Sequence, residues 1–211
     1  MYSVVVVDDH PAICLAVKAT IEMDGEFKVV GEASTGLAAL SIVRDRLPSL
    51  VVVDLDLPGM NGLSLIGRIR NEHPGVRLLV LSAQQEAIFA IRALKAGADG
   101  FVSKTEDMRK VAGAARSVLA GYSVFPMCAL ALFTDAGADA GSGASQLSSL
   151  TDRELTVLQY LARGLSNREI SDLLHISNKT VSTFKARIFE KLGISTIVEV
   201  VDLARRHHLI M

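Results

Sequence analysis

The sequence predicts an α/β domain, built on a doubly wound five-stranded parallel sheet, that is joined to a second, smaller all-α domain. Short β-branched runs alternate with longer amphipathic stretches through the first half of the chain. A segment rich in Gly, Ala and Ser follows, and the remaining residues carry helical periodicity without strand signals. The 211 residues suffice for two domains that each bury a core.

The strand candidates are short and almost entirely apolar, which is typical of strands buried on both faces of a sheet. They lie at residues 3–7, 27–32, 50–54, 77–82 and 100–103. Helical stretches with apolar residues at three- and four-residue spacing lie at 12–23, 36–46, 62–71, 85–96 and 106–120. This alternation predicts a parallel sheet covered on both faces. In such open sheets, ligands bind at the carboxyl ends of the strands.

The segment TDAGADAGSGASQLSS, residues 134–149, has no apolar periodicity. Its length and composition favour a flexible linker over an ordered surface loop. We therefore expect a first domain over residues 1–122, a linker over 123–147 and a second domain over 148–211.

Four helices are expected in the second domain, because each has a start signal and two also have a stop signal. The first shows the capping-box pattern TDRE, in which Thr151 is followed three residues later by Glu154. The expected N-caps are Thr151, Ser166, Ser177 and either Ser195 or Thr196, and the expected helix-ending glycines are Gly164 and Gly193. The fourth helix should run to about Arg206.

The composition limits the function classes. No apolar run reaches the roughly 18 residues of a membrane span, and two acids in MYSVVVVDDHP argue against a secretory signal. Cys14 and Cys128 lack metal-ligand spacing and are expected to be buried apolar side chains of a reduced, cytoplasmic protein. The formal net charge is -1, and residues 148–211 carry only nine basic against seven acidic residues. Charge alone is therefore weak evidence for a nucleic-acid partner.

Acidic residues follow two of the predicted strands. Asp8 and Asp9 end the first strand and Asp54 ends the third. These strands are neighbours in a doubly wound sheet of order 2-1-3-4-5, so the three carboxylates should converge. Like charges this close repel and raise one another's pKa values. A hard divalent cation with oxygen ligands removes that cost, and Mg²⁺ suits an open site with few protein ligands.

Ser82 ends the fourth strand and Lys104 follows the fifth, which adds a hydroxyl and a cation to the same edge. Together with carboxylates and a metal, these groups can handle a phosphoryl group. Each residue alone has a simpler explanation, because strand-end Asp and Ser residues often cap helices and loop lysines are usually solvated. The five positions together favour the phosphoryl site. We expect His10, beside the pocket, to pack or to cap the following helix.

Four motifs, VVVVDDHP, VVVDLDLPGMNG, LVLSA and AGADGFVSK, resemble the receiver domain of bacterial two-component response regulators, which has a flavodoxin-like fold. The resemblance covers about residues 2–122. It implies that Asp54 is the phosphoacceptor and that Asp8 and Asp9 form the acidic pocket. It further implies Mg²⁺ bound by Asp9, Asp54 and the main-chain carbonyl of Asp56, a switch hydroxyl at Ser82, a switch aromatic at Phe101 and a phosphate-pairing lysine at Lys104. Thr105 replaces the proline of many receivers, which affects only the loop geometry there.

The triplet Asp54-Leu55-Asp56 also resembles the DxD signature of haloacid-dehalogenase-like phosphatases, which use a strand-end aspartate with Mg²⁺. Two features argue against this enzyme class. Pro58 stands where those enzymes carry a hydroxyl residue, and the triplet sits on a third strand after an acidic pair. The phosphatase therefore remains a remote alternative.

Residues 166–192, SNREISDLLHISNKTVSTFKARIFEKL, have the layout of a helix-turn-helix. A wheel of about 100° per residue places Val181, Phe184, Ile188 and Leu192 in one narrow sector, which we expect to be core. The opposite sector holds Lys179, Ser182, Thr183, Ala186 and Glu190, with Arg187 at its edge. Such a small, polar and basic face can enter a major groove. The wheel is equally compatible with an ordinary solvated face.

The stretch from LTDREL to EKLGIS is similar, nearly end to end, to the LuxR-type helix-turn-helix, and the whole chain resembles a NarL/FixJ-type response regulator. The SNKTVST stretch is most similar to the subgroup that contains BvgA and EvgA. The resemblance implies base contacts near Ser182, Thr183 and Ala186, and phosphate contacts by Lys179, Lys185 and Arg187. Many relatives carry lysine where Ser182 stands, so the family does not give the target DNA sequence.

The last predicted helix keeps Ile197, Val200, Val201 and Ala204 along an apolar stripe. This stripe either packs entirely on its own domain or, as the resemblance implies, forms part of a homodimer contact that matches a near-palindromic promoter site.

The resemblance as a whole implies a bacterial regulator of transcription that is not an enzyme. A sensor histidine kinase phosphorylates Asp54, and the modification controls dimerisation and sequence-specific binding to double-stranded DNA. RNA polymerase is a further expected partner, and a membrane is not. A phosphorylation-independent DNA-binding protein with a vestigial pocket is the remaining alternative. The complete acid pocket with Lys104 argues against it.

Overall fold

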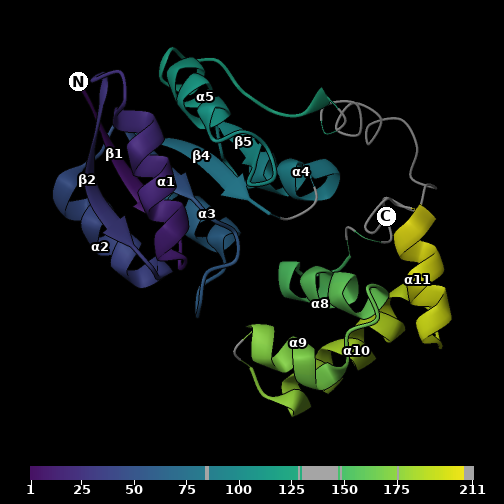
Figure 1. Ribbon diagram of the computed structural model, residues 1–211. Coiled ribbons are helices and arrows are strands. Elements are labelled where there is room, and N and C mark those ends of the chain that lie inside the picture. Colours follow the sequence, from purple (N-terminus) through teal and green to yellow (C-terminus); the bar gives the residue numbers. More distant parts are fainter. Residues whose placement is uncertain (84–85, 128, 130–146, 148, 175, 207–211) are drawn as a thin grey trace. The chain divides into compact units, whose positions relative to one another are not determined.

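The computed structural model describes residues 1–83, 86–127, 129, 147, 149–174 and 176–206, which belong to two compact units, Met1–Asp135 and Ala136–Met211 (Figure 1). Most of the expected linker, together with Cys128, lies outside the described residues. Each unit is treated by itself below. No helix in the described part of the chain combines the length and the hydropathy that crossing a membrane requires.

The first unit is a five-stranded parallel sheet of order β2-β1-β3-β4-β5, as predicted. Its strands are β1 (Tyr2–Val7), β2 (Phe27–Ala33), β3 (Leu50–Val53), β4 (Arg77–Ser82) and β5 (Gly100–Ser103). Its helices are α1 (Pro11–Glu22), α2 (Gly36–Arg46), α3 (Gly62–Glu72), α4 (Glu86–Ala96) and α5 (Arg109–Leu119). Helices α1 and α5 pack together on one face, whereas α3 packs with α2 and α4 on the other (Figure 1).

The apolar strands are buried on both faces because side chains alternate between the two faces with a period of two. Val4 and Val6 of β1 lie in the core beneath α1 and α5, with residues of the neighbouring strand β3 and of β4 beyond it. Val5 and Val7 are buried as well, on the face that α2 covers. Cys14 of α1 is buried in the same core, as expected. The continuous valine run therefore belongs to a strand that is buried on both faces of the sheet, as the sequence indicated.

The helix boundary that differs most from expectation is the start of α5, which begins at Arg109 rather than at residue 106. The carboxylate of Asp107 accepts a hydrogen bond from the Arg109 main-chain N–H at 2.9 Å. This local side-chain acceptor competes with helical hydrogen bonding and delays the helix start.

The chain that leaves α5 returns to the edge of the sheet. Val124 forms an isolated parallel bridge with Gly100 of β5. The main-chain N–H of Phe101 donates to the Val124 carbonyl at 2.7 Å, and the Val124 N–H donates to the Asp99 carbonyl at 3.1 Å. The first residues of the expected linker thus lie along β5, and the exact domain boundaries stay a prediction.

The second unit contains α8 (Asp152–Ala162), α9 (Asn167–Leu174), α10 (Asn178–Leu192) and α11 (Ile197–Arg206). Helix α8 contacts each of the other three. The buried carboxylate of Glu154 also pairs with Lys191 at 2.6 Å, which ties α8 to α10.

The predicted caps of these helices are confirmed. Thr151 and Glu154 form a capping box at α8, and reciprocal hydrogen bonds join Ser166 to Glu169 and Thr196 to Glu199 in the same pattern. Ser177 caps α10, and Gly164 and Gly193 take positive φ after α8 and α10. Between the two candidates for the start of α11, the cap is Thr196.

A glycine fixes the distance between α3 and the loop after β3. A methyl group on Gly62 would lie 2.2 Å from the Asp54 carbonyl oxygen and 2.7 Å from Leu55 Cα. Both atoms are backbone, so α3 would have to move away from the loop that carries Asp54.

We therefore expect Gly62→Ala to lower the free energy of unfolding by about 1–3 kcal/mol, the usual cost of overpacking. Gly67→Ala in the same helix is the matched control, because nothing lies within 4 Å of its added methyl group. It should stabilise the fold by about 0.5–1 kcal/mol, the usual gain for Gly→Ala inside a helix. Urea unfolding of both variants checks the prediction, and a shift of the same sign in both would contradict it.

Candidate functional site

The carboxyl ends of β1 and β3 bring acidic residues together. Asp8 and Asp9 follow β1, and Asp54 follows its neighbour β3. The Asp54 N–H donates to the Val7 carbonyl at 2.8 Å, which fixes Asp54 beside the end of β1. Carboxylate oxygens of all three residues and a ring nitrogen of His10 lie within 4.8 Å of one another. The predicted convergence of the three carboxylates is confirmed.

Lys104 joins this cluster from the end of β5. Its Nζ lies 2.7 Å from Asp8 Oδ2 and 2.8 Å from Asp54 Oδ2. Its main-chain N–H donates to the Ser82 carbonyl at 2.8 Å, which holds the loop after β5 against the end of β4. The cation is therefore held between two buried carboxylates, at the position that the sequence predicted.

Burial sets the charge state of Asp54, whose side chain is only 2% exposed. Burial, with smaller contributions from the negative charges of Asp8 and Asp56, raises the pKa of Asp54, and the contacts with Lys104 lower it; the net result is a pKa of about 6. Burial lowers the pKa of Lys104, but its contacts with Asp54 and Asp8 outweigh this and leave that pKa raised. Lys104 therefore keeps its charge at neutral pH and partly compensates the crowded carboxylates.

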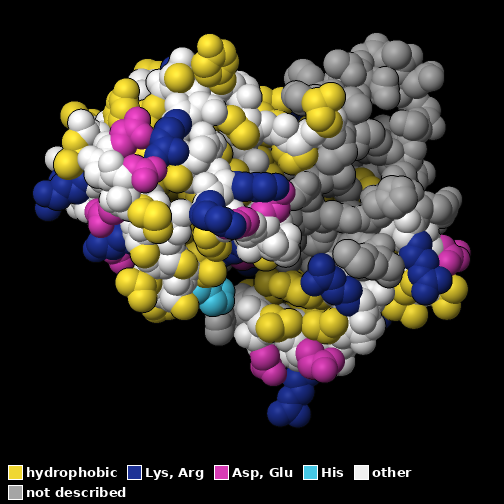
Figure 2. Space-filling view, turned by 45° about the horizontal axis from the view of Figure 1, so that its top comes forward, with side chains coloured by type: hydrophobic (Ala, Val, Ile, Leu, Met, Phe, Trp, Pro, Cys, Tyr) yellow, Lys and Arg dark blue, Asp and Glu magenta, His cyan; other side chains and the backbone are white. Residues whose placement is uncertain are grey.

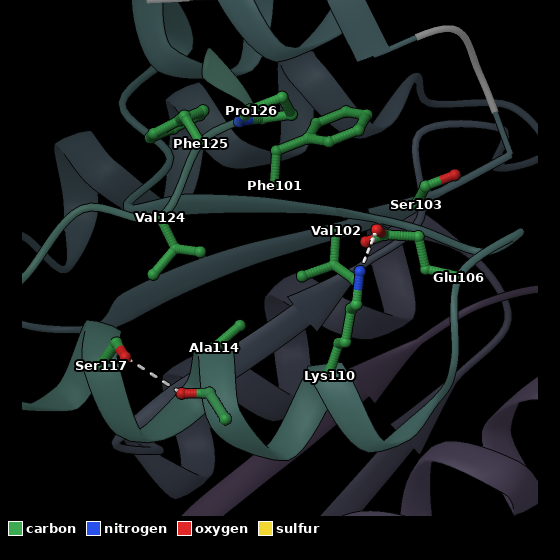
Figure 3. Close-up of a pocket in the computed structure, with 11 residues that line it drawn as sticks. Phe101, Val102, Ser103, Glu106, Lys110, Ala114, Ser117, Val124, Phe125 and Pro126 are labelled. Atoms are coloured by element: carbon green, nitrogen blue, oxygen red, sulfur yellow. Dashed lines mark hydrogen bonds and ion pairs between the residues drawn. The ribbon is translucent and has the colours of Figure 1, made fainter.

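The other predicted switch residues lie around this centre in different ways. Ser82 is buried at the end of β4, in register with Ser103 of β5. Phe101 is buried in a separate pocket between β5, α5 and the chain after it, beside Phe125 and Pro126 (Figure 3). The Asp56 side chain is exposed, and the expected role of its main-chain carbonyl stays a prediction.

The donor set fits a hard divalent cation. Asp9 Oδ1 is shielded from solvent and accepts no hydrogen bond from the described residues. Such a buried, unsatisfied carboxylate oxygen is costly unless a cation or a proton compensates it. Asp8, Asp9 and Asp54 together outnumber Lys104, the one lysine that pairs with them among the described residues. Oxygen donors with an uncompensated negative charge are the ligands that Mg²⁺ prefers.

His10 departs from the expected packing or capping role. It occupies the N-cap position of α1, but its side chain is 67% exposed and makes no cap hydrogen bond. Its main-chain N–H donates to Asp8 Oδ1 at 2.9 Å, so the carboxylate of Asp8 organises this helix start instead. The His10 Nδ1 faces the acids, 2.7 Å from Asp9 Oδ1. The position of His10 directly after two strand-end acids is the sequence feature that could have predicted this contact with Asp9.

Helix α10 carries the predicted core and the predicted outward face. Val181, Ile188 and Leu192 are buried and Phe184 is half-buried, as the wheel indicated. The exposed residues are Lys179, Ser182, Thr183, Ala186, Arg187 and Glu190. Lys185 is half-buried instead, with its Nζ 5.5 Å from the centre of the Phe189 ring, a cation–π contact.

Hydrogen bonds fix the short side chains on the exposed face of α10. Asn167 of α9 donates through Nδ2 to Ser182 Oγ at 3.1 Å. The hydroxyls of Ser182 and Thr183 donate to main-chain carbonyls one turn earlier in the helix. The sequence does not predict a role for Asn167, because its contact with Ser182 joins residues fifteen positions apart on two different helices.

The charged surface does not single out a nucleic-acid face by itself. On the face shown in Figure 2, basic side chains lie next to acidic ones on the first unit. This agrees with the formal net charge of -1 for the chain. The exposed face of α10 is therefore defined by its shape and its hydrogen bonds more than by a strong field.

Two protein families match the chain, one in each half. The family described as "Response regulator receiver domain" matches residues 4–116. The family described as "Bacterial regulatory proteins, luxR family" matches residues 148–204. The first match covers the sheet and the acid cluster, and the second covers all the helices of the second unit except the end of α11.

Full-length relatives carry the same pair of halves. BvgA of Bordetella pertussis, a putative positive transcription regulator of virulence factors, is 44% identical over 99% of this chain and 100% of its own length. EvgA of Escherichia coli, a DNA-binding transcriptional activator, is 30% identical over 97% of this chain and 98% of its own length. Both belong to the subgroup that the SNKTVST stretch resembles.

A solved structure of RcsB from Salmonella enterica serovar Typhimurium, bound to promoter rprA in the presence of phosphomimetic BeF3-, has a similar fold. It aligns with a TM-score of 0.64 and 24% identity over 96% of this chain and 98% of that chain.

The Asp54 titration depends on Lys104, which leads to a prediction. Lys104→Met removes the cation that lowers the pKa of Asp54, so this pKa should rise above about 6 in the metal-free protein. Carbon NMR of the Asp54 carboxyl group through a pH titration measures the change. Lys95→Met, which removes an exposed cation from α4, is the control and should leave the titration unaltered. An unaltered or lowered pKa in Lys104→Met would refute the assigned electrostatics.

Proposed function

The chain belongs to the response regulators that join a receiver domain to a LuxR-type DNA-binding domain, and we propose that phosphorylation of Asp54 by a sensor histidine kinase controls its dimerisation and its binding to specific DNA sites. One observation carries the proposal. Lys104 is held between the buried carboxylates of Asp8 and Asp54, beside an unsatisfied oxygen of Asp9. A cation and two further acids thus surround one buried carboxylate.

In the proposed reaction, a carboxylate oxygen of Asp54 attacks the phosphorus of the donor, and the bond from phosphorus to the donor imidazole breaks. Asp9, Asp54 and the main-chain carbonyl of Asp56 would hold Mg²⁺, which neutralises charge on the phosphoryl oxygens. Asp54 gains negative charge when it is phosphorylated. Lys104 would then pair with phosphoryl oxygens in place of a carboxylate oxygen.

The signal would leave this site through β5. The Lys104 N–H already holds the Ser82 carbonyl, and the Phe101 N–H holds the Val124 carbonyl. A shift of Lys104 and the Ser82 hydroxyl toward the phosphoryl group would therefore act on β5, on Phe101 and on the chain that leaves the receiver. Phosphorylation would favour a conformer that dimerises or releases the DNA-binding unit.

The exposed face of α10 would read the DNA. Lys179 and Arg187 have long, positively charged side chains that would contact DNA phosphates. Lys185, which lies over the Phe189 ring, would contact a phosphate from that position. Ser182, Thr183 and Ala186 are short and lie on the exposed face, where they can approach base edges.

A second copy would complete the DNA complex. Ile197 and Val198 at the start of α11 are exposed, 40% and 64%, whereas Val200 and Ala204 are buried in the unit. The exposed pair gives two copies an apolar contact, and the resulting two-fold dimer would match a near-palindromic promoter site.

The remaining parts of the proposal concern the cellular location of the protein and its binding partners. We expect the protein in the cytoplasm, where it meets the kinase and the promoter, and a bound dimer could contact RNA polymerase. BvgA and EvgA, matched over nearly their whole lengths, are named as transcription regulators, which favours a regulator over the phosphatase alternative. The intact pairing of Lys104 with Asp8 and Asp54 argues against a vestigial pocket.

Phosphorylation should occur at Asp54 alone. Acetyl phosphate with Mg²⁺ should label the wild-type chain and leave Asp54→Asn unlabelled, because the amide is not a nucleophile for phosphorus. Asp56→Asn is the matched control, since its exposed side chain is not an expected ligand and its main-chain carbonyl is retained. Intact-mass measurement detects the added phosphoryl group. Undiminished labelling of Asp54→Asn would remove Asp54 as the phosphoacceptor.

The two kinds of contact on α10 should separate in binding experiments. Lys179→Ala should weaken binding to all sequences alike and reduce the salt slope by about one, since one phosphate contact is lost. Thr183→Ala should change the preference among half-sites by roughly 1–3 kcal/mol with the salt slope nearly unchanged. Both variants keep the buried Val181 and Ile188, so the unit should stay folded.

Fluorescence anisotropy with a panel of DNA sites at several salt concentrations measures both quantities for the two variants. The placement of α10 in the groove fails if Lys179→Ala reorders the sites while Thr183→Ala leaves their order intact.

A further inference from the structure

The His10 side chain stands at the rim of the acid pocket in a position that neither packing nor capping explains. Its Nδ1 lies 2.7 Å from Asp9 Oδ1 and 3.4 Å from Asp8 Oδ1. A ring nitrogen of His10 falls within the group of ligand atoms that Asp8, Asp9 and Asp54 form, all within 4.8 Å of one another. A nitrogen donor is therefore added to a site that otherwise offers carboxylate oxygens.

The main chain at His10 is held in place. Its N–H donates to Asp8 Oδ1 at 2.9 Å, and Pro11 follows as the first residue of α1. The backbone is extended at this position, with φ -98° and ψ 107°. The main-chain anchor thus places the ring beside the pocket, and the side chain itself is 67% exposed.

The two neighbouring donor atoms have the spacing of ligands on one ion. At metal–ligand distances of about 2.1 Å, adjacent ligands of an octahedral ion are about 3 Å apart. Asp9 Oδ1 and His10 Nδ1 are 2.7 Å apart, and the oxygen accepts no hydrogen bond from the described residues. A cation between them would replace this direct contact and bind both donor atoms.

Nitrogen and oxygen donors select different metals. Mg²⁺ takes oxygen ligands and keeps several waters, whereas imidazole suits later transition-metal ions such as Fe²⁺, Ni²⁺ and Zn²⁺. Co²⁺ lies between Fe²⁺ and Ni²⁺ in the general order of affinities. We propose that His10 Nδ1 is a direct ligand when a transition-metal ion occupies the acid pocket, and that it makes the pocket prefer such an ion to Mg²⁺. This inference rests on the divalent-cation site of the proposed function. His10 is thereby the residue that determines which divalent cation fills the receiver.

The test compares two metals on the full-length chain at pH 7.5. Calorimetry measures Mg²⁺ affinity. Cobalt absorption spectra measure the Co²⁺ that saturating Mg²⁺ displaces, so that binding at other histidines is not counted. The variants are His10→Ala, Asp9→Ala and, as the histidine control, His73→Ala at the end of α3.

His10→Ala should lower the Mg²⁺-displaceable Co²⁺ affinity by at least about tenfold, since the loss of even an outer-shell partner of a metal ligand costs roughly 10–100-fold. Its Mg²⁺ affinity should stay within about twofold of wild type, because water replaces the imidazole without loss of an oxygen ligand. Asp9→Ala should weaken both metals, and His73→Ala neither. The cobalt spectrum should also change in His10→Ala, because one nitrogen donor is replaced by oxygen.

The outcomes separate the inference from the function on which it rests. Unchanged Co²⁺ affinity and spectrum in His10→Ala would overturn the inference and show that His10 only forms an ion pair with Asp9. An equal loss for both metals would overturn it too, since His10 would then only shape the pocket. If Mg²⁺ bound no more tightly to wild type than to Asp9→Ala, the cation site of the proposed function would fail instead.

Discussion

The repulsion among buried carboxylates at adjacent strand ends is the constraint around which the first unit is arranged. Burial raises the pKa of Asp54 so strongly that it stands at about 6 even with Lys104 in contact, so its ionised form is costly in the folded protein. Lys104 offsets part of this cost by reaching both Asp8 and Asp54, and it can do so only because β5 ends level with β4 at Ser82. The charge balance of the site therefore depends on the register of the sheet.

The uncompensated part of that charge gives the site its chemistry. A pocket in which lysine satisfied every acid would have no use for a metal and little affinity for a phosphoryl group. Here Asp9 keeps a shielded oxygen without a hydrogen bond among the described residues, and His10 rather than a second lysine faces it. The protein therefore retains a local deficit of positive charge that an exchangeable cation can fill.

Much of this arrangement could be predicted from sequence because its causes are local or periodic. Valine runs mark doubly buried strands, and acids at strand ends mark the edge where Asp8 and Asp54 meet. The geometry that escaped prediction depends on side-chain direction or on contacts across the fold. His10 was expected to pack or cap, yet its exposed ring makes no cap hydrogen bond and faces the acid cluster. Asn167 reaches Ser182 across two helices, and no spacing rule along the chain reports such a contact.

The return of Val124 to β5 has a consequence for self-association. β5 is an outer strand, and an outer strand normally presents unpaired main-chain groups that can template pairing with another chain. Here the Phe101 N–H and the Asp99 carbonyl are already occupied by the protein's own backbone. A foreign strand could add at this edge only by displacing residues around Val124. The segment that leads out of the receiver therefore also protects its sheet from intermolecular strand addition.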